Sequence, residues 1–223
     1  MSTYTTTGRR AGPRPDARSG WRLASGLFVL SAVPVAAGAL RLVQLAGGPD
    51  LIPGDPRFGR FPVALVLHIV GSVVFALLGI LQFLPRLRRR HPAWHRRSGR
   101  LLVVTGLLVT GSALWLTVFY DPQPGTGDLL YFFRLAFATA MAYSIVRGFA
   151  AVRRRDIARH RAWMIRAYAI GLGAGTQVLT EGIGDALFGT GVLAGDLAKG
   201  AGWAINLLVA EWAIHRGRRR SRA

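Results

Sequence analysis

The sequence contains no cysteine. The chain therefore provides no disulfide, no thiolate ligand for a metal or an iron–sulfur cluster, and no attachment point for a c-type haem. Acidic residues are also few: 10 Asp and Glu stand against 29 Lys and Arg, and Lys199 is the one lysine. The chain has no Ser/His/Asp grouping, phosphate loop, H-E-x-x-H motif or Rossmann fingerprint. Nothing in it indicates a hydrolase, a transferase or a nucleotide-binding protein.

Apolar residues are abundant, at 51% of the 223 residues, and the mean hydropathy is +0.32 although 17% of the residues are charged. Long apolar runs alternate with short arginine-rich ones, which is typical of a polytopic helical membrane protein. A net charge of +19 in a soluble protein would favour nucleic acid as the partner. Here the basic residues occupy alternate loops, so the lipid bilayer is the expected partner and nucleic acid is not.

We expect an all-α bundle of six transmembrane helices, since about 20 residues cross a bilayer. The expected domain covers 21–215, with spans at about 21–46, 61–84, 101–120, 129–152, 162–187 and 197–214. Residues 1–20 and 216–223 are basic, and we expect the first of these tails to be disordered. Ala37-Gly38-Ala39 resembles a signal-peptide cleavage site, which leaves open whether the first span is retained or removed.

Most arginines lie in the N-terminal tail, in 86–100, in 147–161 and in the C-terminal tail, whereas the other three loops together hold Arg57, Arg60 and Lys199 against six aspartates. Arginine stays on the cytoplasmic side of a membrane. This distribution predicts six spans of an inner (cytoplasmic) membrane protein with both termini in the cytoplasm. Removal of the first span would leave five helices that also satisfy the rule.

Several polar residues fall within the outer halves of the expected spans. A charge near the bilayer centre costs about 2.5–3.5 kcal/mol on insertion scales, so each needs a partner or a purpose. Glu181 or Asp185 is placed to neutralise Arg41 or Arg134, which would make a structural network. The alternative is a polar cavity open to the outer face, with His68 as its titratable group. Either arrangement predicts one intramembrane polar site made of His68, Arg41, Arg134, Gln177 and Glu181.

Histidines raise the question of a redox cofactor. A b-type haem in a helical bundle commonly takes two axial histidines at matched depth. Gln82 stands fourteen residues after His68, where a di-haem pattern would have a second histidine. His95 and His160 fall at the cytoplasmic edge, in what we expect to be arginine-rich loops. A redox function with haem b or a quinone remains an alternative to the polar site, and no metal site is expected.

A set of motifs along the chain resembles a known family. His68-Ile69 is followed by Gly79, Gln82-Phe83, His95-Arg96 and Gly99-Arg100, and then by His160-Arg161-x-Trp163-Met164-Ile165-Arg166-x-Tyr168-Ala169. Over roughly residues 62 to 170 this resembles a bacterial membrane family catalogued as domain of unknown function 2306. The resemblance implies an integral membrane protein and no settled activity. The residues that carry it on the cytoplasmic side are Gln82, His95, Arg96, Arg100, His160, Trp163 and Arg166.

Two functions of different kinds therefore stay open. The first is a non-enzymatic membrane protein, either a small-solute carrier or a membrane assembly factor. The second is a membrane redox protein that binds haem b or a quinone through intramembrane histidines. The cytoplasmic arginines also predict contact with anionic lipids, worth about 1 kcal/mol per residue near an anionic leaflet.

Overall fold

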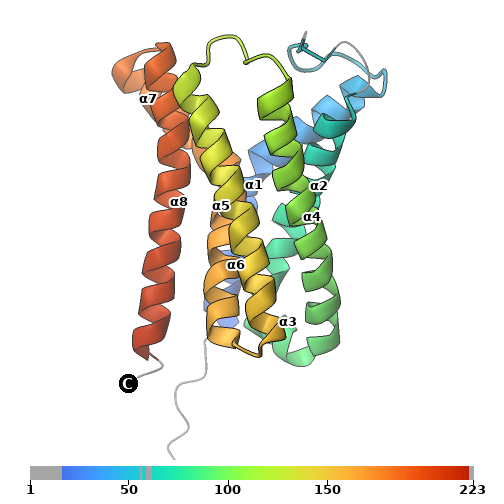
Figure 1. Ribbon diagram of the computed structural model, residues 1–223, viewed down its shortest axis with the longest axis vertical. Coiled ribbons are helices and arrows are strands. Elements are labelled where there is room, and N and C mark those ends of the chain that lie inside the picture. Colours follow the sequence, from blue (N-terminus) through green and yellow to red (C-terminus); the bar gives the residue numbers. More distant parts are fainter. Residues whose placement is uncertain (1–16, 56, 59–61, 221–223) are drawn as a thin grey trace, which may run out of the picture.

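The computed structural model describes residues 17–55, 57–58 and 62–220. This part of the chain is all helical and contains no strand, which confirms the expected fold class (Figure 1). Most of the expected N-terminal tail, Phe61 of the second span and 221–223 lie outside the described residues. The helices are α1 (Ala17–Leu45), α2 (Val63–Gln82), α3 (Pro85–Arg90), α4 (Pro92–Phe119), α5 (Asp128–Arg153), α6 (Ile157–Gly171), α7 (Gly173–Phe188) and α8 (Val192–Arg220).

Five of these helices, α1, α2, α4, α5 and α8, are long and apolar enough to cross a membrane. The segment expected as one span at 162–187 is instead two helices, α6 and α7, that meet at Leu172 and are shorter than a span. A Cβ at Gly173 would collide with the indole of Trp203, so α7 begins where a close approach to α8 requires glycine. Asn206 Nδ2 donates to the carbonyl of Ala169 at 3.0 Å, which satisfies an acceptor next to the break.

The arginine-rich segment 86–100 differs from the expected loop because it is almost entirely helical. Pro85 and Pro92 begin α3 and α4, a position where proline loses no hydrogen bond and already has a helical φ. His95 therefore lies in the first turn of α4, where its N–H bonds to the carbonyl of His91 at 3.1 Å. His160 is likewise in the first turn of α6, which Asp156 caps. The expectation that these histidines stand in loops is wrong.

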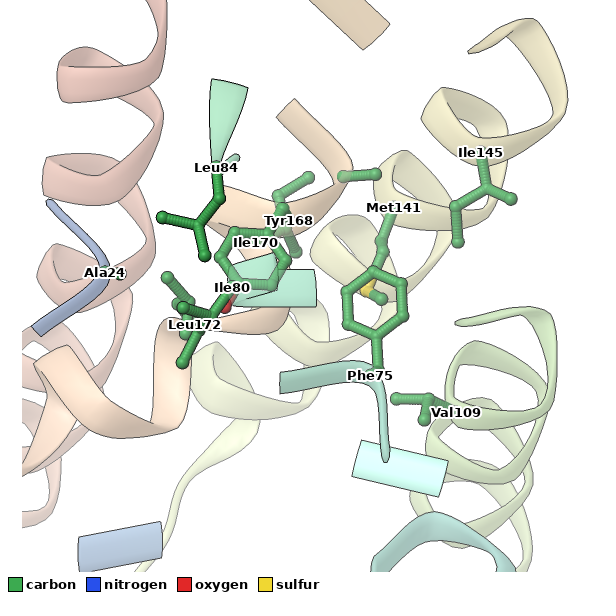
Figure 2. Close-up of a cluster of buried hydrophobic side chains, with 11 residues drawn as sticks. Ala24, Phe75, Ile80, Leu84, Val109, Met141, Ile145, Tyr168, Ile170 and Leu172 are labelled. Atoms are coloured by element: carbon green, nitrogen blue, oxygen red, sulfur yellow. The ribbon is translucent and has the colours of Figure 1, made fainter. Parts of the chain in front are cut away.

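The helices pack around a core in the middle of the bundle. α2 lies between α1 and α4, α5 packs on α4 and α6, and α8 packs on α7 and α6. Tyr168 of α6 is at the centre, where its hydroxyl donates to the carbonyl of Ala76 at 2.8 Å. Its ring contacts Phe75 and Phe83 and lies directly against Gly79. The buried cluster is drawn in Figure 2 and includes Ala24, Phe75, Ile80, Leu84, Val109, Met141, Ile145, Tyr168, Ile170 and Leu172.

Large apolar side chains cover the outside of the bundle, as expected for helices that contact lipid. The side chains of hydroxyl residues within the helices mostly bond to carbonyls of the preceding turn, as Ser144 does to Ala140 at 2.7 Å. They therefore need no water. Prominent exposed apolar residues are Val29, Val70, Val104, Phe119, Phe132, Val146, Leu179, Leu187, Leu208 and Trp212.

The two ends of the bundle differ in charge. α3, the α5–α6 turn and the C-terminal end of α8 lie together at one end, which we call the basic end (Figure 1). The start of α1 is there too, because a Cβ at Gly20 would contact Pro85 and Leu84. The connections 46–55, 120–127 and 189–191 lie at the opposite end, which we call the acidic end. This separation is what the arginine distribution predicts.

One buried carboxylate links α8 to the start of α5 at the acidic end. Asp196 of α8 is 1% exposed and accepts hydrogen bonds from the backbone N–H groups of Gly127, at 3.1 Å, and Leu130, at 3.0 Å. These N–H groups belong to the start of α5, whose own N-cap residue offers no side-chain bond. Asp196 thus caps α5 from another helix, where the helix dipole also favours a negative charge.

Candidate functional site

A cavity of about 500 Å³ lies within the bundle and extends to the loops of the acidic end. Residues of α1, α2, α4, α5, α6, α7 and α8 line it together with the 51–58 loop. Four of the five residues predicted for an intramembrane polar site, Arg41, His68, Arg134 and Gln177, are among them. Glu181 is not. The bundle thus brings together polar residues that lie on four helices and far apart in the sequence.

His68 of α2 is held by α4. Its Nδ1 is 3.2 Å from both the carbonyl of Val109 and Oγ of Ser112, while that hydroxyl lies 3.0 Å from the same carbonyl, positioned to donate to it. When the serine proton is used in this way, both groups facing Nδ1 are acceptors, so the geometry assigns the ring proton to Nδ1. In the neutral ring Nε2 is then the acceptor nitrogen. Among the described residues nothing bonds to it.

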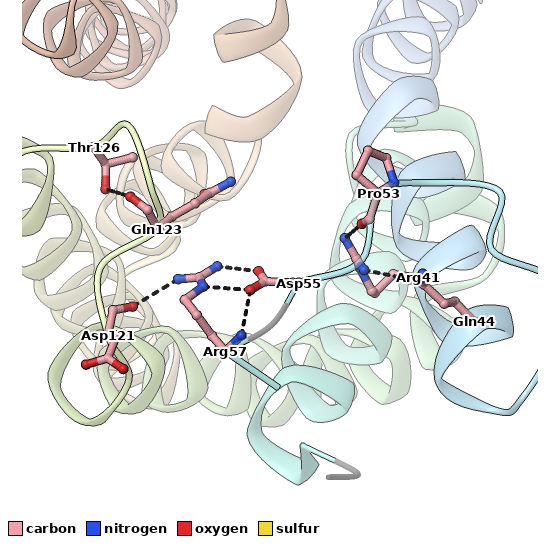
Figure 3. Close-up of polar contacts among 8 residues, drawn as sticks. All are labelled: Arg41, Gln44, Pro53, Asp55, Arg57, Asp121, Gln123 and Thr126. Atoms are coloured by element: carbon pink, nitrogen blue, oxygen red, sulfur yellow. Dashed lines mark hydrogen bonds and ion pairs between the residues drawn. The ribbon is translucent and has the colours of Figure 1, made fainter. Parts of the chain in front are cut away.

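Arg41 and Arg57 organise the mouth of the cavity (Figure 3). Arg41 donates to Oε1 of Gln44 at 2.5 Å and to the carbonyl of Pro53 at 2.9 Å, which ties the loop to the end of α1. Arg57 binds Asp55 through two nitrogens and donates to the carbonyl of Asp121 at 3.1 Å. Hydrogen bonding with Arg57 lowers the pKa of Asp55, and the same contact raises the pKa of Arg57.

Arg134 of α5 is the third arginine of the cavity. In the described part of the chain its guanidinium makes no hydrogen bond and no ion pair within 4.0 Å. Glu181, which was expected to neutralise Arg41 or Arg134, pairs instead with Nζ of Lys199 at 2.7 Å. Asp185, the other expected partner, is exposed to solvent. The expected pairs are thus not seen as direct ion pairs, although Glu181 is close enough to act electrostatically on Arg134. Nε2 of Gln177 donates to the carbonyl of Lys199 at 3.1 Å.

The deeper wall of the cavity is apolar and partly aromatic. Phe137 of α5 and Trp203 of α8 stack with their ring centres 4.8 Å apart, and both line the cavity. Met141, Ile170 and Leu172 continue this wall into the core. Sequence reasoning missed Trp203, Phe137 and the Asp55–Arg57 pair because no spacing within one helix connects them. The one available signal was the position of Trp203 inside an expected span, because tryptophans that anchor a helix at the membrane interface lie near span ends.

The motif residues that were expected on the cytoplasmic side form a separate cluster at the basic end. Nε2 of Gln82 donates to Oγ of Ser98 at 2.8 Å, which links α2 to α4. Nδ1 of His160 lies 2.9 Å from the carbonyl of Gly148, which links α6 to α5. Arg96 and Arg100 are exposed on α4. These contacts hold helices together and do not involve the cavity.

Arg166 and Trp163 belong to the same end. Nη2 of Arg166 donates to Oε2 of Glu211 at 2.8 Å, and its guanidinium carbon lies 4.7 Å from the centre of the Trp163 ring. Arg147 approaches the same ring at 5.9 Å. Trp163 thus contacts two cations. These cation–π contacts account for its position as well as a preference for the membrane interface does.

His95 differs from its neighbours because its Nδ1 is buried and has no hydrogen-bond partner among the described residues. Arg88, His160 and Arg96 are close enough to act on it electrostatically. Burial, together with the neighbouring charges of Arg161 and Arg89, lowers the pKa of Arg88 on α3. No group of three or more His, Asp or Glu side chains that could hold a metal is found in the described ranges.

Several membrane-crossing helices, a lipid-facing apolar surface and charged loops gathered at the two ends define a multi-pass helical membrane protein. The family model described as "Predicted membrane protein (DUF2306)" matches residues 65–214, and the chain belongs to this family. The resemblance seen in the sequence motifs is thereby confirmed. Comparison with curated proteins and with solved structures finds no match to the chain.

Proposed function

We propose that this protein binds a small molecule within the membrane and acts as its carrier. The observation that carries the proposal is the cavity of about 500 Å³, which has charged and polar groups at the acidic end and an apolar, aromatic deeper wall. Small-molecule sites in proteins have this size and this combination of an apolar lining with a few convergent polar groups. An assembly factor has no need of such a cavity.

The proposal includes a topology. α6 and α7 follow one another from the basic end to the acidic end, so together they supply a sixth crossing beside the five long helices (Figure 1). The arginine-rich basic end then faces the cytoplasm with both termini, and the cavity mouth faces outward, in an inner membrane. The first helix is part of the working protein, because Ser31, Pro34, Gly38 and Arg41 line the cavity.

Single cysteines test both the cavity and the topology, because the chain has no native cysteine. Ala138 of α5 lines the cavity, whereas Ala136, two residues away, is exposed on the outside of the bundle. A membrane-impermeant maleimide added from outside should modify Ala138→Cys and leave Ala136→Cys unmodified. Protection of both, or reaction only from the cytoplasmic side, would contradict an outward-facing cavity.

The same variant separates a carrier from an assembly factor. A carrier alternates between states, so Ala138→Cys in inverted vesicles should also react from the cytoplasmic side, at a rate that changes when transported solute is present. Reaction from the outer side alone would favour a static binding protein. Ala136→Cys again serves as the matched control for reagent that crosses the lipid.

A redox function is the second candidate, favoured by one observation at the basic end. His95 carries a buried nitrogen without a partner, and His160 lies near it on another helix. Two histidines on different helices are the usual axial ligands of haem b, and nearby arginines suit its propionates. The polar cavity does not fit such a haem, since His68 is the one histidine lining it. There a quinone is the redox ligand that fits, as a molecule with a polar head and an apolar body.

The absorption spectrum decides the haem part. Protein expressed with ample haem and then purified should show a Soret band that His95→Ala and His160→Ala each abolish, while His91→Ala, on an exposed neighbour, keeps it. The absence of a Soret band from the unaltered protein ends this candidate.

The arginines of the basic end also face the anionic leaflet in this topology, which should strengthen binding to anionic lipid by about 1 kcal/mol per residue.

A further inference from the structure

Arg134 is an arginine inside the bundle whose guanidinium makes no hydrogen bond and no ion pair within 4.0 Å with any described residue, although Asp196 and Glu181 act on it electrostatically from farther away. It lies on α5 between Phe133 and Leu135 and lines the cavity. Arginine keeps its proton in proteins, so the side chain carries a full charge. A charge within a membrane protein costs several kcal/mol unless something compensates it. The question is what does so here.

The carboxylates of the acidic end are otherwise engaged or too exposed to serve. Asp55 is bound to Arg57, Glu181 to Lys199, and Asp196 to the N-terminus of α5. Asp50 is exposed and accepts from Gln44. The remaining three are exposed at the surface, namely Asp121, Asp128 and Asp185. No carboxylate of this end is left within ion-pair distance of Arg134.

The cavity as a whole has the same imbalance. Three arginines and one aspartate line it, which gives a formal charge of +2 with His68 neutral. Asp55 compensates Arg57, so the excess belongs to Arg41 and Arg134. Arg41 bonds to an amide and a carbonyl, which are neutral groups. The side chains that line the cavity therefore carry an excess of positive charge, which Asp196 and Glu181 oppose from outside the lining. The polar part of the cavity adjoins a wall formed by the stacked rings of Phe137 and Trp203.

We propose that the molecule bound in this cavity is an organic anion, a carboxylate with an apolar or aromatic body, and that Arg134 is its ion-pair partner. This inference rests on the proposed binding function of the cavity. The planar guanidinium presents two parallel N–H groups that match the two oxygens of a carboxylate. The apolar body of the anion lies toward Phe137 and Trp203. The anion supplies the direct ion-pair partner that the described residues do not provide for Arg134.

Three probes of the same size and different charge test the proposal: 2-naphthoate, 2-naphthylmethanol and 2-naphthylmethylammonium. Binding of each is measured by equilibrium dialysis against the full chain in nanodiscs of zwitterionic lipid, with empty nanodiscs as the blank. The carboxylate should bind at least tenfold more tightly than the alcohol, which corresponds to about 1.4 kcal/mol. The ammonium should bind more weakly than the alcohol.

Variants assign the preference to Arg134. Arg134→Gln should remove the preference for the carboxylate and leave the affinity for the alcohol within about twofold, and Arg134→Lys should restore part of it. The matched control is Arg147→Gln, which removes an arginine of the same helix that lies over Tyr143 and Trp163 at the basic end. It should bind all three probes as the unaltered protein does.

A stability measurement distinguishes a ligand-binding arginine from a structural one. Without ligand, Arg134→Gln should unfold at the same temperature as the unaltered protein or at a higher one, because it removes a charge inside the bundle that has no direct ion pair. A clear loss of stability would mean that the arginine serves the fold, and would overturn the proposal.

The outcomes separate this inference from the proposed function. Binding of alcohol and carboxylate with equal affinity, or a carboxylate preference that survives in Arg134→Gln, overturns the anion proposal and leaves the cavity as a binding site. If maleimide reaches Ala138→Cys but no carboxylate binds, the anion proposal alone fails. If no probe binds and Ala138→Cys is also protected, both fail.

Discussion

The guanidinium of Arg166 and the carboxylate of Glu211 form a two-pronged ion pair that joins α6 to α8. The ring of Trp163 covers one face of the guanidinium. α6 ends half-way along the bundle, next to the break at Leu172. The pair lies between this break and the basic end, and it fixes α6 to α8. Arg166 is one of the motif residues, and its partner lies at the far end of the matched region.

We predict a measurable coupling between these two residues. Both side chains are partly exposed, at 23% and 37%, so solvent weakens the attraction and about 1 kcal/mol of coupling is expected. A double-mutant cycle of Arg166→Gln and Glu211→Gln, followed by thermal unfolding in detergent, measures it. Arg216→Gln, which removes a nearby arginine packed on Trp212, is the control and should leave the effect of Glu211→Gln unchanged. Additive single effects would show that the pair contributes nothing.

The close approach of α2 and α6 depends on the absence of a side chain at Gly79. A Cβ there would overlap the ring of Tyr168, whose hydroxyl is fixed to Ala76. Gly79→Ala should therefore lower the free energy of unfolding by about 1–3 kcal/mol, as overpacking of a filled core does. Gly111→Ala, also within a helix, meets nothing within 4 Å and should cost nothing. Equal effects of the two substitutions on thermal unfolding would contradict this packing.

Much of the fold follows from the sequence because bilayer spans impose long apolar runs. The five long helices lie where the hydropathy predicts them, and the segregation of arginine to one end was expected. The break at Leu172 was not, because Gly171 to Gly175 read as ordinary small-residue packing within a span. Trp203 and Asn206 of α8 contact the chain on either side of the break, and no window of the sequence contains these contacts.

The site was predictable in part for the same reason. Polar residues in apolar runs are conspicuous, so Arg41, His68, Arg134 and Gln177 stood out before their cavity was known. Their partners were not predictable, because charge pairing depends on helix rotation and neighbour order. Lys199 and Glu181 meet because α7 packs on α8, an arrangement that counting along the chain cannot supply.

Asp196 should be the most sensitive carboxylate of the acidic end. It is fully buried and bonds to two backbone N–H groups at the start of α5, so Asp196→Ala leaves both without an acceptor. We expect a loss of about 2–4 kcal/mol in unfolding free energy, which combines a lost cap with buried unsatisfied donors. Asp196→Asn keeps one acceptor oxygen and should lose less. Asp185→Ala, at an exposed position on α7, is the matched control. An unchanged free energy of unfolding in Asp196→Ala would show that water replaces the carboxylate.

The Asp55–Arg57 pair should make the stability of the loop at the cavity mouth sensitive to acid. Arg57 lowers the pKa of Asp55 below its ordinary value of 3.8, so the ionised carboxylate is favoured in the folded loop. A group with a depressed folded pKa contributes its stability fully above the unfolded value and loses it as the pH falls through the folded value. The difference in unfolding temperature between the unaltered protein and Asp55→Asn should therefore be constant above about pH 5 and shrink below about pH 4. Asp50→Asn, in the same loop but with an exposed carboxylate, is the control and should show no comparable change. A difference that persists unchanged to pH 3 would mean that the ionised carboxylate of Asp55 does not stabilise the folded loop.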